Sequence, residues 1–190
     1  MDHIVHVQRG KTLQYVLDNS CLSARAKNTY TDLYQGYVQL FYDKTERLVA
    51  KQSNILLHLL SVPFGAVGLR ICNPYLIYFG KKPVGEIRYK GRCSTMKCDG
   101  ANYEYRLHSQ YISSLTMDGR QIAILQFHYH PHYFYTVSCN EIGEKHLWAV
   151  LLLCAYYDAR HYANETRFGL SYFPNDPFAD RATWKPKDAR

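Results

Sequence analysis

No stretch of this sequence is apolar for long enough to cross a bilayer. The longest apolar run, Leu147–Tyr157, holds eleven residues, whereas a spanning helix needs roughly 20. The first residues, MDHIV, lack both the basic and the apolar region of a secretion signal. We therefore expect a cytoplasmic protein without a transmembrane segment, which would meet a membrane only peripherally.

The cysteines are too scattered to indicate a disulfide framework or a metal motif. None of the six stands in a Cys-x-x-Cys pair, and the spacing of Cys93 and Cys98 is poor for zinc. Disulfides are rare in proteins that are not exported. We expect reduced thiols at Cys21, Cys72, Cys93, Cys98, Cys139 and Cys154.

Sequence signatures of catalysis are also missing. The chain has no GxSxG nucleophile elbow, no GxxxxGK[ST] phosphate loop, no GxGxxG and no HExxH. Asp158 would suit a general acid if it were buried, but we place it at a helix end facing water or a partner. We predict a protein that is not an enzyme and holds no cofactor.

Acidic side chains are the minority charge. Lysine and arginine number 23 against 16 aspartate and glutamate, which gives a net charge of +7. A basic surface attracts phosphate groups on nucleic acid or on lipid headgroups, although solubility alone also explains this charge. Tyrosine is abundant, with 18 residues, and favours strands because its ring packs on a half-buried sheet.

A repeated hairpin pattern dominates the chain. Apolar strands flank short polar turns, and Asp-Gly at two of these turns is a strong hairpin signal. The predicted hairpins turn at residues 43–46, 80–82, 99–100 and 118–119, and further strands are predicted at residues 4–7, 68–72, 103–107, 111–115 and 133–139. Many short strands joined by tight turns predict an antiparallel sandwich or barrel. The apolar stretch Ile55–Phe64 fits either a strand or a short helix.

One segment breaks the strand pattern. Leu147–Tyr157 is rich in leucine and alanine, follows acidic Glu144 and closes at the charged residues 158–161, as a helix does. It is apolar on every face, so an amphipathic stripe does not explain it. We predict a helix buried all round in the middle of the sheet. A single domain should cover residues 1–165, followed by a partly irregular tail over 166–190.

The order of these elements resembles the tubby C-terminal-like superfold, which includes tubby domains, phospholipid scramblases and LURP-one-related proteins. The resemblance covers roughly residues 35–162 and rests on Tyr75–Tyr89, Tyr103–Leu107, Met117–Ala123 and the helix Leu147–Asp158. It implies a mostly-β fold, a closed antiparallel barrel of about twelve strands around a central buried hydrophobic helix. It also implies phosphoinositide binding without catalysis, but no ligand residue of the family maps onto a position here.

The predicted binding site is a basic hairpin. Between Gly80 and Arg92 one acid, Glu86, accompanies five cations, which on a rigid sheet could hold a phosphate. Edge-protecting lysines on a solvated strand explain the same pattern. The candidate anion-binding or lipid-binding residues are Lys81, Lys82, Arg88, Lys90 and Arg92.

A histidine cluster is the second candidate site. In an extended segment His128, His130 and His132 project to one side, where three imidazoles could bind zinc or sense pH. Pro131 interrupts a regular strand there, and a polar outer face alternating with tyrosines explains the pattern equally.

Three functions follow from these patterns. The first is a non-catalytic tubby-like domain that engages an anionic membrane lipid or a protein partner through the basic hairpin. The second is a nucleic-acid-binding β domain, in which aromatic rings stack beside cations and affinity falls steeply with salt. The third is a metal protein centred on the three histidines.

Overall fold

The computed structural model describes residues 1–9, 12–27, 36–52, 74–90, 93–108, 111–128 and 133–168. Of Arg9, Lys90 and residues 160–168 it describes the backbone alone. The described strands are β1 (Asp2–Arg9), β2 (Leu13–Leu17), β3 (Leu22–Lys27), β4 (Tyr37–Tyr42), β5 (Thr45–Gln52), β6 (Tyr75–Phe79), β7 (Lys82–Lys90), β8 (Cys93–Cys98), β9 (Ala101–Leu107), β10 (Ile112–Met117), β11 (Arg120–His128) and β12 (Phe134–Cys139). The described helices are α2 (Glu141–Lys145) and α3 (Leu147–Phe168).

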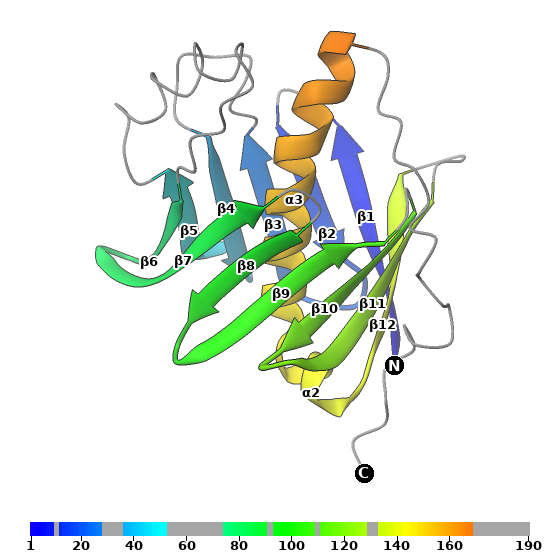
Figure 1. Ribbon diagram of the computed structural model, residues 1–190, viewed down its shortest axis with the longest axis horizontal. Helices are drawn as coiled ribbons and strands as arrows, with labels where there is room; N and C mark the ends of the chain where they lie inside the picture. Colours follow the sequence, from blue (N-terminus) through cyan, green and yellow to red (C-terminus); the bar gives the residue numbers. More distant parts are fainter. Residues whose placement is uncertain are drawn as a thin grey trace.

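The strands form one closed antiparallel barrel. Each strand pairs with the next along the chain, and β1 pairs with β12 to close the ring, with Val5 opposite Tyr135. Figure 1 shows the twelve strands wrapped around α3. Closure leaves no unpaired sheet edge. The predicted mostly-β barrel around a helix is therefore confirmed.

The turns form where the sequence predicts them. Asp99 and Gly100 both have positive φ, of 50° and 80°, and Asp118 and Gly119 repeat this at 48° and 79°. Two successive positive φ angles define the turn that matches the twist of a hairpin. The predicted strand at 68–72 and the stretch Ile55–Phe64 lie outside the described residues. Strands β2 and β3 are additional to the prediction.

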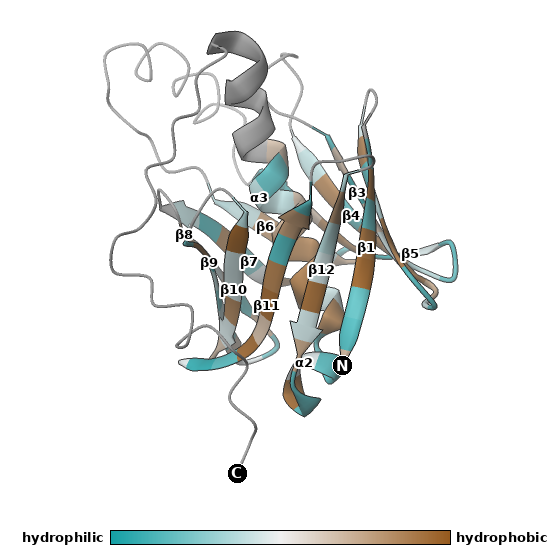
Figure 2. Ribbon diagram, turned by 90° about the vertical axis from the view of Figure 1, so that its right-hand side faces the viewer, coloured by the Kyte–Doolittle hydropathy of each residue, from teal (hydrophilic) through white to brown (hydrophobic). Residues whose placement is uncertain are grey.

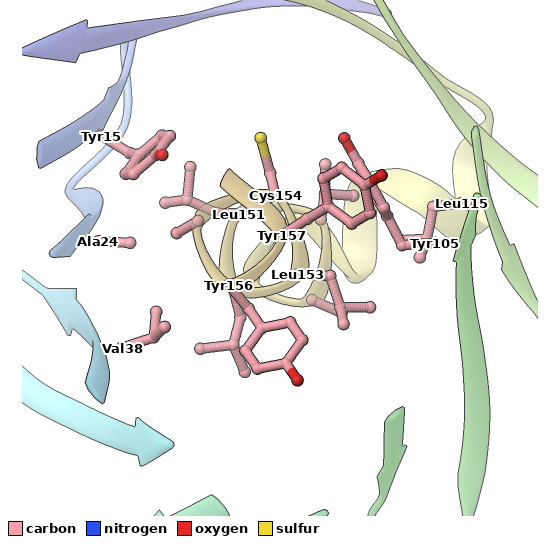
Figure 3. Packing of buried hydrophobic residues seen from close by; sticks show 14 of the residues in the cluster. Tyr15, Ala24, Val38, Tyr105, Leu115, Leu151, Leu153, Cys154, Tyr156 and Tyr157 are labelled. Carbon is pink, nitrogen blue, oxygen red and sulfur yellow. The ribbon is translucent and has the colours of Figure 1, made fainter. Parts of the chain in front are cut away.

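Helix α3 fills the barrel. From Ala149 to Ala159 no residue is more than 5 % exposed, so every face of three helical turns is buried. In Figure 3, Leu151 and Leu153 point to opposite sides of the helix, toward Ala24 of β3 and Leu115 of β10. Burying each leucine contributes roughly 1.5–3 kcal/mol. The predicted burial is confirmed for Ala149–Tyr157, whereas Leu147 and Trp148 at the start of the predicted range are partly buried.

The strands supply an interior that fits this helix. Inward positions alternate with outward ones, which gives β1, β11 and β12 the bands of opposite hydropathy in Figure 2. Helix α3 packs most extensively against β3 and β4. On β3 the inward residues Ala24 and Ala26 are small, so the helix can approach closely. On β6, three strands away, the Tyr75 ring meets Tyr156 edge-on, with centroids 4.9 Å apart.

A short capped helix leads into α3. The Asn140 side chain accepts a hydrogen bond from the backbone N–H of Gly143 at 2.8 Å, which caps α2. A Cβ at Gly143 would lie 2.2 Å from the carbonyl oxygen of Ile122, so only glycine allows α2 this close to β11.

Helix α3 then runs to Phe168, beyond residues 158–161, which were expected to end it. No helix in the described part of the chain is both long and apolar enough to span a membrane.

Asp158 corrects one prediction. It was expected to face water at a helix end, but it lies within α3 and is 4 % exposed. Its carboxylate accepts hydrogen bonds from the hydroxyls of Tyr15, at 2.9 Å, and Tyr135, at 2.8 Å. These tyrosines belong to β2 and β12, the two strands that flank β1. Asp158 therefore connects the helix to the strands on both sides of β1. The two tyrosine hydroxyls supply the hydrogen bonds that water would give to an exposed carboxylate.

Two further groups near this carboxylate stay protonated at neutral pH. Burial, and then the charge of Asp158, raise the pKa of Cys154 well above its usual value. Burial, followed by the charges of Cys154 and Asp158, does the same to the pKa of Tyr105. The Tyr105 hydroxyl accepts a hydrogen bond from Ser113 at 2.8 Å. This polar cluster is thus satisfied within the core.

Removing the Asp158 carboxylate should destabilise the barrel. Asp158→Leu leaves two buried tyrosine hydroxyls without this acceptor, at a cost of about 1–3 kcal/mol each. Urea unfolding measures the loss, and adding Tyr15→Phe and Tyr135→Phe to the same chain should restore part of it. An unchanged free energy of unfolding in Asp158→Leu would show that the carboxylate does not hold the helix.

Thiol alkylation should follow burial. Burial raises the pKa of Cys98 to about 11 and that of Cys139 to about 12, while Cys21 is exposed. Because the thiolate is the reactive form, an alkylating agent near pH 8 should modify Cys21 well before Cys98, Cys139 or Cys154. Peptide mapping by mass spectrometry reads the order, and equal rates in the folded protein would contradict it.

Candidate anion-binding surface

The β6–β7 hairpin carries the cations predicted to form a site. Gly80, with φ of 59°, starts the turn, and Lys81 and Lys82 follow it fully outside the barrel. Arg88 lies six positions further along β7, about 20 Å away at the rise of a strand. The structure therefore brings Lys81 and Lys82 together at the hairpin tip and does not bring Arg88 to them.

Arg88 is engaged by its own strand. Its Nε and Nη2 atoms lie 3.0 and 3.1 Å from the two carboxylate oxygens of Glu86. Arg106 on β9 makes the same kind of pair with Glu104, at 2.7 Å. An acid two residues before each arginine thus offsets its charge on this side of the barrel. The side chain of Lys90 and all of Arg92 lie outside the described residues.

His128 interacts with the neighbouring strand. Its Nε2 atom lies 3.0 Å from the hydroxyl of Thr136, and its ring stacks on Phe134 with centroids 4.5 Å apart. His130 and His132 lie outside the described residues. Within the ranges that the structure covers, no group of three or more His, Cys, Asp or Glu could hold a metal ion.

The structure reveals a surface that the sequence prediction missed. On β3 to β6, three cations lie over three aromatic rings: the Arg25 guanidinium carbon is 5.6 Å from the Phe41 ring centre, that of Arg47 is 5.9 Å from Tyr42, and the Lys51 nitrogen is 4.8 Å from Tyr78. Tyr42 follows Phe41 directly and is opposite the inward residue Leu22, so it is not on the outer side of the sheet with Phe41. We call the four outward residues, Arg25, Phe41, Lys51 and Tyr78, the basic–aromatic face. Such contacts occur roughly once per 70–80 residues, so three on four neighbouring strands are a local concentration.

Charge on these four strands is almost entirely positive. They carry Arg25, Lys27, Arg47 and Lys51 against one acid, Glu46. Glu46 accepts a hydrogen bond from the Gln39 amide. Among the described residues, no ion pair involves Arg25, Arg47 or Lys51, in contrast to Arg88 and Arg106. Their charge is available to an anionic partner.

Strand pairing places the cations and rings side by side. Arg25 and Lys51 are exposed because each lies between two inward, buried neighbours. Lys27 is opposite Tyr37, which is opposite Lys51. The register shifts between Leu40 and Phe41 and again between Ile77 and Tyr78. The extra residue at each shift, Arg47 on β5 and Val84 on β7, lies on the strand that pairs with the ring's own strand.

A shallow depression lies next to this face. It has a volume of about 370 Å³ and lies over β6 to β9. Gly85 forms part of its floor, where a Cβ would lie 2.2 Å from the carbonyl oxygen of Lys97. Its lining includes Glu86 and Asp99 beside Lys97, so the acidic side chains in the depression outnumber the basic one.

Comparison with known proteins gives no match to a family model, a curated protein or a solved structure. The barrel around a helix is the architecture that a tubby-like protein would have, but architecture alone does not identify a family. The resemblance to the tubby-like superfold therefore stays a prediction.

The lysine–ring contact on the candidate surface should be measurable. A double-mutant cycle of Lys51→Gln and Tyr78→Leu should give a coupling of about 0.5–1 kcal/mol in urea unfolding, as for exposed cation–π pairs. The same cycle on Lys97 and Tyr78, which lie on strands that do not pair, should give none. Equal coupling in the two cycles would contradict the contact.

Proposed function

We propose that this chain is a non-catalytic binding domain that holds a phosphate-bearing partner on the outside of the barrel, over β3 to β7. The observation that carries this proposal is the excess of cations over acids on β3 to β6, with three of these cations held over aromatic rings. Charge-assisted hydrogen bonds from arginine and lysine are the usual means of holding phosphate.

The filled interior supports an outer site. Helix α3 occupies the axis of the barrel, and the residues around it are buried. Barrels that hold a small ligand keep their interior free for it. The partner therefore binds to the outer face of the strands or to the turns.

The hairpin tip extends the basic surface toward β7. Lys81 and Lys82 are exposed there, next to Phe79, whose side chain is 55 % exposed. A cation pair beside an exposed ring suits an anionic lipid headgroup at a membrane surface, which is the ligand that the tubby-like resemblance implies. Nucleic acid presents the same phosphate chemistry, and cations stacked on rings along β3 to β6 favour it.

Charge reversal tests the proposal. The double variants Arg25→Glu/Lys51→Glu and Lys81→Glu/Lys82→Glu are compared with a matched control, Arg120→Glu/Lys145→Glu, which changes the net charge equally at exposed positions elsewhere. The probes are inorganic polyphosphate, vesicles of phosphatidylcholine with and without phosphatidylinositol bisphosphate, and a single-stranded oligonucleotide.

We expect one or both test variants to lose binding by at least about tenfold, since each removed phosphate contact weakens affinity and its salt dependence. The control should bind as the unmodified protein does. If no probe binds, or if the control loses as much as the test variants, the proposed function is wrong. Loss confined to Lys81→Glu/Lys82→Glu places the phosphate at the hairpin tip.

A further inference from the structure

The basic–aromatic face has the pattern of a nucleic-acid platform on neighbouring strands. Arg25 is opposite Gln39, which is opposite Val49, which is opposite Tyr78. Figure 1 shows β3, β4, β5 and β6 next to one another in the wall of the barrel, as their pairing requires. This row therefore begins with a cation on β3 and ends with a ring on β6, with Gln39 and Val49 between them.

We infer that this face binds single-stranded nucleic acid, with the polymer lying across β3 to β6; the inference rests on the proposed phosphate binding and names its partner. A four-stranded sheet face can stack two or three bases on its aromatic rings while cations meet the phosphates. Here Phe41 and Tyr78 supply the rings, and Arg25 and Lys51 supply the charge.

The exposure of the rings fits stacking. Phe41 and Tyr78 are half-buried against the sheet. The cation over each ring ends a flexible side chain that can move aside for a base, and the arginine guanidinium offers a second flat surface. Apolar residues lie between these positions, with Val49 opposite Tyr78 and Leu76 opposite Lys51. The face thus provides aromatic and apolar surface as well as charge.

Other anionic partners fit less well. A lipid headgroup is held by cations that converge on one phosphate, whereas Arg25 and Lys51 lie on strands separated by β4. Phe41 and Tyr78 are half-buried, so they have little area to insert into a membrane interface. A nucleic-acid duplex keeps its bases stacked inside, so the rings would gain nothing from it. Exposed bases are what make cations and rings useful together.

The test separates base stacking from phosphate binding. Fluorescence anisotropy measures affinity for a labelled single-stranded oligothymidylate, for an abasic oligomer of equal length, and for a duplex. The ring variant is Phe41→Leu/Tyr78→Leu, and the matched control is Tyr111→Leu, an exposed ring next to β10. Thermal melting by circular dichroism checks that each variant is folded.

We expect the oligothymidylate to bind at least about tenfold more tightly than the abasic oligomer, because stacked bases add to affinity. The ring variant should remove this difference, and Tyr111→Leu should preserve it. Lys51→Gln removes one positive charge and leaves the aromatic rings in place. It should therefore lower the slope of log affinity against log salt by about 0.7 for a single strand.

Equal binding of the base-containing and abasic oligomers would overturn this inference and leave phosphate binding intact. Preferential binding of phosphatidylinositol bisphosphate vesicles, unaffected by Phe41→Leu/Tyr78→Leu, would also overturn it in favour of a lipid partner. Failure of every phosphate probe to bind would remove the proposed function together with the inference.

Discussion

The burial of α3 on every side is the constraint from which the rest of this structure follows. A helix that is apolar all round is stable only where other elements cover each of its faces. The closed barrel does this, and Asp158 supplies a directional contact where packing alone would be non-specific. By accepting hydrogen bonds from Tyr15 and Tyr135, it ties the helix to the strands on both sides of β1.

Because α3 fills the interior, a site for a partner is to be sought on the outer surface. Inward positions of the strands are committed to the helix, so the residues that can meet a partner are those that alternate with them. On β7 and β9 these outward arginines pair with glutamates of the same strand. On β3 and β5 they lie over rings instead. The two sides of one barrel therefore differ in what they offer to an anion.

The sequence predicted those features whose signals are local. The apolar run of α3 and the Asp-Gly turns need no distant partner, and both are confirmed. Strand β3 was missed because Leu22–Lys27 contains two alanines and a serine, which have low strand propensity, and only the nearby helix explains them. Asp158 was misplaced because its tyrosine partners are more than 20 residues away.

In the candidate site, too, local sequence signals were read correctly and contacts between strands were missed. Lys81, Lys82 and Arg88 are close in sequence, but strand geometry separates Arg88, which pairs with Glu86. The pairs of the basic–aromatic face join different strands, and two β-bulges set their register. Alternation of Arg25 and Lys27 with alanine was the one local signal for that face, and it becomes informative only after β3 is assigned as a strand.

Access of a soluble paramagnetic probe to α3 tests the central claim most directly. In nuclear magnetic resonance spectra of the folded protein, the probe should leave the backbone amides from Val150 to Asp158 unbroadened on every face of the helix. Broadening that recurs every three to four residues along this segment would mean that one face meets solvent. That result would contradict a helix enclosed by the barrel.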